Sequence, residues 1–511
     1  MSMNSINTIE QQKEKCEFEG YRKRYQWWFL IATLLCEIGY MYNQTAIMTL
    51  QSPLLTELEL DDFQYNQILL FQYLPGVISS LLSGFLADRF GSAFTFALGI
   101  IINYAGQFIS TAGVAHSNFS ALLAGQLIMT IGTYALLISK IKMLNSWFST
   151  KEIGKALSTT IMIDISAIIL CNIGYPSLYQ ISGSLFVPFI VGTGVILAAL
   201  PFGVIQITLH SRLLKKHQQI QEQHLDDSLE ERLSVWASMK VVLRYPKTFW
   251  LLVIFAVASL VSFLCTKWFT TLYLIHQFSL NTGEAHVTLA VALVIAGIVT
   301  IMAGIILDTC GRLPLTAILG STLFIVGLIL NMTLPHCNRC IKGGVAFTII
   351  SSGALINLLV SALIIMRLIR APSLGVALGI PLFLTSAMMM FFPTVESIIS
   401  ANTFDSKGYT WVFLLNTGLV VISCLMALII LITDSQGPKR LKAVLPPMRR
   451  NSRSTRNSIA SIPSENEVHI AVAGALNMKK DANPANENKT HNSSTKDKDF
   501  EAGNPNHEIR V

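Results

Sequence analysis

The sequence predicts an all-α membrane protein with twelve transmembrane helices in two pseudo-symmetric six-helix bundles. Hydrophobic residues make up 52% of the chain and charged residues only 13%, whereas a soluble domain is about one-quarter charged. Twelve apolar stretches approach the roughly 20 residues that a membrane-spanning helix needs. A short charged segment, 84–91, recurs at 304–312 in the second half. The repeat indicates two related bundles.

Six predicted spans precede a polar linker and six follow it. They cover residues 27–48, 64–86, 93–114, 119–141, 154–176, 185–207, 249–272, 285–307, 314–334, 343–366, 374–399 and 411–433. The chain therefore divides into an N-terminal tail 1–26, a first bundle 27–208, a linker 209–248, a second bundle 249–433 and a C-terminal tail 434–511.

Basic residues predict the orientation. Arg22, Lys23 and Arg24 precede the first span, and the linker is rich in Lys and Arg, whereas the loop after the first span contains Glu57 and Glu59 and no basic residue. Because basic loops stay on the cytosolic side, we expect both termini and the linker in the cytosol.

Two polar segments lie outside the spans. Charged and apolar residues mix over 210–241, which predicts an amphipathic helix on the cytosolic face. The C-terminal tail is rich in Asn, Ser and Lys, which predicts disorder. Its first part is polybasic and suits anionic membrane lipid, although an inert solvated tail fits as well. The net charge of +7 lies in such loops and tails and indicates no nucleic-acid partner.

The repeated segment has the same layout in both halves. The first copy contains Gly84, Asp88, Arg89 and Gly91, and the second contains Gly304, Asp308, Gly311 and Arg312. The glycines would allow close helix approach and a tight turn. Two bundles with matching charged helix ends are typical of secondary transporters, which expose a central site by rocking.

This segment resembles the signature loop of the major facilitator superfamily, between spans 2 and 3 and between spans 8 and 9. The resemblance covers residues 27–433. It implies that each aspartate caps a neighbouring helix, pairs with an arginine and latches the bundles in the outward-open state. Ser92, Ala93 and Phe94 stand where the family often has further basic residues, which implies a weaker first latch.

Other segments are similar to the lysosomal dipeptide transporters of the major facilitator domain-containing protein 1 family. They are Gln72-Tyr-Leu-Pro75, Ser146-Trp-Phe-Ser-Thr-Lys-Glu152, Phe249-Trp-Leu-Leu252, Lys267-Trp-Phe269 and Asp405-Ser-Lys-Gly-Tyr409. The resemblance implies dipeptide export from lysosomes and a glycosylated luminal accessory protein. The family has charges in the middle of spans 4 and 5. Here we expect Gln126, Tyr134 and the stretch around Ile165 at those places.

Charged residues inside spans are costly and are candidates for function. Glu37, Asp164 and Lys267 lie in spans 1, 5 and 7. Glu37 and Lys267 could bind the two ends of a zwitterion, and Asp164 could take a proton. Helix packing is the alternative for the two acids, and a lysine that reaches the headgroups is the alternative for Lys267. Glu396 is expected at the membrane interface.

Neutral polar residues could shape the same site. Tyr40, Gln72 and Tyr134 are the candidates, with packing as the alternative. Cys337 and Cys340 could form a disulfide in the luminal loop after span 9, and Asn118 begins an Asn-Phe-Ser glycosylation sequon. The sequence shows no metal-ligand set, cofactor motif or catalytic constellation, so we expect no metal site, no cofactor and no enzyme.

Three functions remain open. The leading hypothesis is a facilitative or proton-coupled carrier, symporter or uniporter, for a small polar solute, by resemblance a dipeptide or amino acid, in the lysosomal membrane. A sugar or organic-anion carrier of the plasma membrane is the second. A non-transporting sensor or scaffold is the third. Expected partners are a small-molecule substrate, membrane lipid, the accessory protein and a second copy in a homodimer.

Overall fold

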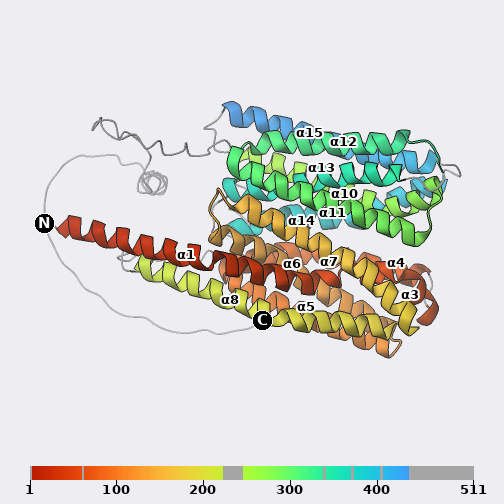
Figure 1. The fold of residues 1–511 in the computed structure, drawn as a ribbon, viewed down its shortest axis with the longest axis horizontal. Coiled ribbons are helices and arrows are strands. Elements are labelled where there is room, and N and C mark those ends of the chain that lie inside the picture. Colours follow the sequence, from red (N-terminus) through yellow and green to blue (C-terminus); the bar gives the residue numbers. More distant parts are fainter. Residues whose placement is uncertain are drawn as a thin grey trace, which may run out of the picture. The chain divides into compact units, whose positions relative to one another are not determined.

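The computed structural model describes residues 3–59, 62–222, 245–337, 341–369, 373–402 and 407–436. Within these ranges long helices joined by short loops account for nearly every residue, which confirms the predicted all-α fold class. In Figure 1 the helices of the first half and those of the second half form two groups. All of them belong to one unit of the chain, Met1–Leu445.

The first group contains eight helices, of which two are short. They are α1 (Met3–Tyr42), α2 (Ala46–Thr49), α3 (Gln51–Glu57), α4 (Asp62–Arg89), α5 (Ser92–Ala115), α6 (Phe119–Trp147), α7 (Ile153–Ser182) and α8 (Phe186–Glu222). The second group consists of α10 (Lys247–Phe278), α11 (Thr282–Cys310), α12 (Leu313–Thr333), α13 (Lys342–Leu368), α14 (Leu374–Asn402) and α15 (Lys407–Gln436).

Ten of the described helices, α5 to α8 and α10 to α15, are long and apolar enough to cross a membrane. α1 and α4 are also long and cover predicted spans 1 and 2. The apolar part of α1 is interrupted by Glu37, Tyr40 and Tyr42, which lowers its mean hydropathy. The count of twelve spans therefore stays a prediction.

α1 ends before the predicted end of the first span. It stops at Tyr42, where the Asn43 amide donates to the carbonyls of Gly39 and Gly192. The bond to Gly192 ties this point to α8 instead of continuing the helix. α1 begins at Met3, so the segment predicted as a tail continues the first span as helix.

The linker also differs from its predicted bounds. α8 continues to Glu222 without a break and α10 begins at Lys247. The amphipathic helix predicted over 210–241 lies mostly outside the described residues, which exclude 223–244. The polybasic run predicted to bind lipid lies in the tail beyond 436, wholly outside them. We call the end of the bundles where α8 ends and α10 begins the linker end.

Glycine contacts set the closest helix pair of the first bundle. α5 and α6 meet at Gly106 and Gly125. A Cβ atom on Gly106 would lie 2.7 Å from the Gly125 carbonyl oxygen, and one on Gly125 would lie 2.7 Å from the Gly106 oxygen. Small residues bring membrane helices together because dispersion contacts then form along both backbones.

We expect Gly125→Val to disrupt folding because a side chain there would force α5 and α6 apart. Yield of monodisperse protein and the melting temperature in detergent should both fall sharply. Gly194→Val is the matched control, since a Cβ at Gly194 of α8 meets nothing within 4 Å. Equal behaviour of the two variants would contradict the packing described.

Candidate functional site

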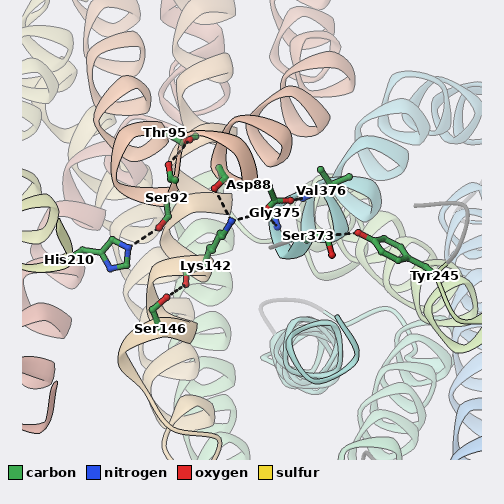
Figure 2. Close-up of polar contacts among 12 residues, drawn as sticks. Asp88, Ser92, Thr95, Lys142, Ser146, His210, Tyr245, Ser373, Gly375 and Val376 are labelled. Carbon is green, nitrogen blue, oxygen red and sulfur yellow. Dashed lines mark hydrogen bonds and ion pairs between the residues drawn. The ribbon is translucent and has the colours of Figure 1, made fainter. Parts of the chain in front are cut away.

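Asp88 joins the two bundles at the linker end. It lies in the last turn of α4, and its carboxylate accepts the N–H groups of Gly375 at 2.8 Å and Val376 at 2.9 Å, in the first turn of α14 (Figure 2). The first N–H groups of a helix have no partner within that helix, and the helix dipole favours a negative charge there. The first bundle therefore caps a helix of the second.

Asp308 makes the reciprocal contact. It lies near the end of α11, and its carboxylate accepts the N–H groups of Gly154 and Lys155, both at 2.8 Å, at the start of α7. Each bundle thus supplies one aspartate and receives one. We call the two contacts the crossed caps. Together they join the two bundles at the linker end.

Glycines let these helices come close enough for the caps to form. A Cβ on Gly84 of α4 would lie 2.5 Å from the Gly375 oxygen. At the other contact, a Cβ on Gly154 would lie 2.7 Å from the Gly304 oxygen, and one on Gly304 2.6 Å from the Gly154 oxygen. The glycines after α4 and α11, Gly91 and Gly311, have φ of 91° and 65° and form the turns that follow.

The cation at the first cap differs from the expected arginine. Lys142 of α6 lies 2.6 Å from Asp88 Oδ1 and also donates to the Ala87 carbonyl at 2.8 Å (Figure 2). The Arg89 guanidinium lies over the Phe90 ring, 5.6 Å from its centroid. Arg312 is exposed at the start of α12, and Arg367 of α13 is the arginine whose charge acts on Asp308.

A buried charge cluster lies inside the first bundle. Lys140 of α6 forms ion pairs with Glu37 of α1 and, at 3.1 Å, with Asp164 of α7. Lys140 is 2% exposed and Glu37 is fully buried. The Tyr40 hydroxyl donates to Glu37 at 3.3 Å. Three helices of the first bundle are thus joined by charge.

The expectation of neutral residues in span 4 missed a buried charge on the same helix. Span 4 was predicted to end at residue 141, but α6 continues to Trp147 and carries Lys140 inside the bundle. In span 5 the charge is Asp164 of α7, which was already a candidate from the sequence. Lys140 and Lys142 lie close together near a helix end, and such a pair is typical of a cytosolic anchor. The sequence pattern therefore favoured an exposed position for Lys140.

The cluster is not fully satisfied. Glu37 Oε2 and Asp164 Oδ1 have no hydrogen-bond partner in the structure. The Asp164 side chain is 18% exposed, whereas those of Lys140 and Glu37 are nearly or fully buried. Two carboxylates and one ammonium leave a formal charge of −1. Asp164 is therefore the more exposed of the two carboxylates, and its unpaired oxygen Oδ1 is buried.

Lys267 is half-buried on α10 and forms no ion pair within the described part of the chain. Its charge acts on Cys171 of α7 in the first bundle. Next to it, Trp268 packs against Tyr73 of α4, with ring centroids 5.7 Å apart. This part of α10 therefore faces the first bundle.

The neutral candidates are placed in different ways. The Tyr134 hydroxyl bonds Ser386 of α14 at 2.7 Å and thus bridges the bundles. Gln72 donates to the Gln44 carbonyl at 2.8 Å within the first bundle, and its Oε1 is buried without a partner. Tyr40 is buried against Glu37 and supports the charge cluster from inside the bundle.

Three further expectations can be placed. Glu396 lies near the end of α14 and is fully buried between helices, and its placement at the membrane interface stays a prediction. Cys337 is disulfide-bonded, and Cys340, its expected partner, lies outside the described residues. Asn118 is exposed and caps α6, where its side chain accepts the Ala121 N–H at 3.1 Å. Within the described residues no group of three acidic, His or Cys side chains could hold a metal ion.

The family model of the Major Facilitator Superfamily matches residues 33–393, which include both caps and the charge cluster. The chain belongs to the major facilitator superfamily. It is therefore a membrane transporter rather than an enzyme, and its substrate is a small molecule.

Solved structures of this superfamily share the fold. A bacterial homologue of the iron transporter ferroportin, in an outward-facing state, is 12% identical with a TM-score of 0.62 over 79% of this chain and 98% of that one. The proton:xylose symporter XylE is 14% identical with a TM-score of 0.61 over 81% and 96%. FucP, in the outward conformation, is 13% identical with a TM-score of 0.55 over 78% and 98%.

A curated relative gives a narrower match. The lysosomal dipeptide transporter MFSD1 of Danio rerio is 26% identical over 130 residues, which is 24% of this chain. The match spans 28% of that protein's length.

We expect Asp88→Ala and Asp308→Ala to open the linker end. Loss of an aspartate cap costs about 0.5–2 kcal/mol, and one or two kcal/mol changes a two-state ratio about 5–30-fold. The readout is the labelling rate of Ser80→Cys, a fully buried position on α4, by a membrane-impermeant thiol reagent, with the exposed Cys310 replaced by Ser. The rate should rise in both variants, and an unchanged rate would rule out the latch.

Lys140→Met should destabilise the protein by about 3–5 kcal/mol because it leaves two buried carboxylates without their cation. Combining it with Glu37→Gln and Asp164→Asn should recover most of the loss. Thermal unfolding in detergent measures both effects, with the exposed Lys215→Met of α8 as control. A Lys140→Met protein as stable as the control would contradict the charge cluster.

Proposed function

We propose that this transporter carries small zwitterions, and dipeptides in particular, by alternating access. The observation that carries the proposal is a pair of charges without a full complement of partners, one in each bundle. Asp164 of α7 has a free carboxylate oxygen in a cluster of net negative charge, and Lys267 of α10 forms no ion pair among the described residues. A dehydrated zwitterion needs an opposite charge at each end.

The partial match to a dipeptide transporter favours a dipeptide over a single amino acid.

The pair differs from the one expected from the sequence. Glu37 was paired with Lys267, but Glu37 is buried against Lys140 and Tyr40. Asp164 takes its place because it is the more exposed carboxylate of the cluster. Glu37 then sets the position of Lys140 and, through it, that of Asp164.

Localisation and direction are part of the proposal. The partial match to a lysosomal dipeptide transporter supports the lysosomal membrane, with the plasma membrane second, and export towards the cytosol. Both termini and the linker would face the cytosol, so the crossed caps would close the cytosolic side. A glycosylated luminal accessory protein and a homodimer would be consistent with the same family resemblance.

Two alternatives are less well supported. A sugar is neutral and would leave both Asp164 and Lys267 uncompensated. A sensor or scaffold without transport activity would not need reciprocal caps that close one side of the membrane. An organic anion would use Lys267 but would be repelled by the negative charge cluster.

The test is counterflow of a labelled dipeptide in liposomes, with competing analogues. The free dipeptide should compete at least ten times better than its N-acetylated or C-amidated form. In Asp164→Asn the N-acetylated dipeptide should compete as well as the free dipeptide. In Lys267→Met the C-amidated dipeptide should compete as well as the free one. The exposed Lys215→Met of α8 serves as control. Saturable exchange without these paired losses would refute the assigned roles, and absence of exchange by folded protein would refute the substrate class.

A further inference from the structure

Glu396 is a second buried carboxylate, in the other bundle, that the proposed substrate contacts do not use. It lies on α14 and has no exposed surface. The Asn416 amide of α15 donates to its Oε1 at 2.6 Å, and Cys265 of α10 lies beside it. Its Oε2 is buried and has no hydrogen-bond partner among the described side chains.

No cation compensates Glu396 within the described residues. Lys267 is two residues from Cys265 on α10. Since each helical residue turns about 100°, the two side chains point to different sides, and Lys267 faces the first bundle. Within the described residues Glu396 therefore has no counter-ion, and its neighbours offer only the Asn416 amide and the weakly donating Cys265 thiol.

The other helices that pack against α14 offer mainly neutral groups near this point. Tyr73 of α4 belongs to the same apolar cluster as Cys265, and Tyr134 of α6 bonds Ser386, earlier on α14. The charged residues of α4, α13 and α15 described with side chains lie at helix ends: Asp88, Arg89, Lys342, Arg367 and Asp434. An ionised Glu396 would thus be a buried charge with neutral hydrogen-bond partners and no counter-ion among the described residues, which is unfavourable.

We propose that Glu396 is a proton-binding site whose occupancy is coupled to the closure of the linker end. In the conformation described, Oε2 carries a proton taken from the aqueous phase. Release of that proton to water leaves the carboxylate, which requires α10, α14 and α15 to separate enough for hydration. Each cycle thus binds and releases one proton at this residue. The coupling to transport rests on the proposed carrier function, whereas the proton site itself does not.

α14 gives the coupling a physical route. Its first turn is capped by Asp88, its middle is bonded to Tyr134 through Ser386, and Glu396 lies further along. Pro381 and Pro393 interrupt the helix between these points. Each proline removes a backbone N–H donor and permits a bend. Movement that releases the cap can therefore change the environment of Glu396.

The first test is infrared difference spectroscopy of purified protein at neutral pH and needs no substrate. Wild type minus Glu396→Gln should show the carbonyl band of one protonated carboxylic acid. Glu284→Gln is the matched control, because Glu284 is exposed and caps α11, where a glutamine can also bond. Its difference spectrum should lack that band. Absence of the band for Glu396 would overturn the proton site.

The second test is dipeptide transport in the same liposomes. Glu396→Gln should keep counterflow but lose accumulation driven by a proton gradient. With one proton per solute, a gradient of one pH unit sustains up to about tenfold accumulation. Gradient-driven accumulation by the variant equal to wild type would overturn the coupling. Failure of counterflow in wild type would instead count against the proposed carrier function and leave the infrared result to decide the proton site.

Discussion

The arrangement of the two bundles depends on one type of interaction made twice, an aspartate at a helix end that binds the first N–H groups of a helix in the other bundle. Asp88, in the last turn of α4, caps α14, and Asp308, near the end of α11, caps α7. The backbone N–H donors are satisfied only when the two helix ends are in contact. The caps therefore favour one discrete arrangement of the bundles over a continuous range of separations. Glycines at both contacts make that approach sterically possible.

The capped helices also carry the groups proposed for transport. α7 begins at the Asp308 cap and carries Asp164, and α14 begins at the Asp88 cap and carries Glu396. Lys142 binds Asp88, while Lys140, on the same helix, binds Glu37 and Asp164. α6 therefore connects the latch to the charge cluster. A movement of the helix ends at the linker end therefore also moves helices that carry buried charges. Those charged side chains have few alternative positions in which they keep their partners.

The sequence predicted the fold class because apolar length and the repeated aspartate segment are local signals. It could not predict Lys140, since the end of an apolar run does not locate a lysine within the bundle, and α6 extends beyond that run. The sequence also could not assign the ion-pair partners, because these contacts depend on packing between distant segments. Asp88 pairs with Lys142 and not with Arg89. Glu37 pairs with Lys140, so it is not the carboxylate proposed to bind the substrate. Glu396 was expected at the membrane interface from its position along α14, and the sequence could not show that its neighbours on α10 and α15 bury it.

The most direct test of the central claim is the distance between the bundles at the linker end. Spin labels at the exposed residues Phe94 of α5 and Leu315 of α12 allow it to be measured by pulsed electron paramagnetic resonance in liposomes. The account predicts a short and a long distance in wild type, with the short one depleted when Asp88 and Asp308 are both replaced by Ala. A single distance, the same in wild type and in the double variant, would contradict it.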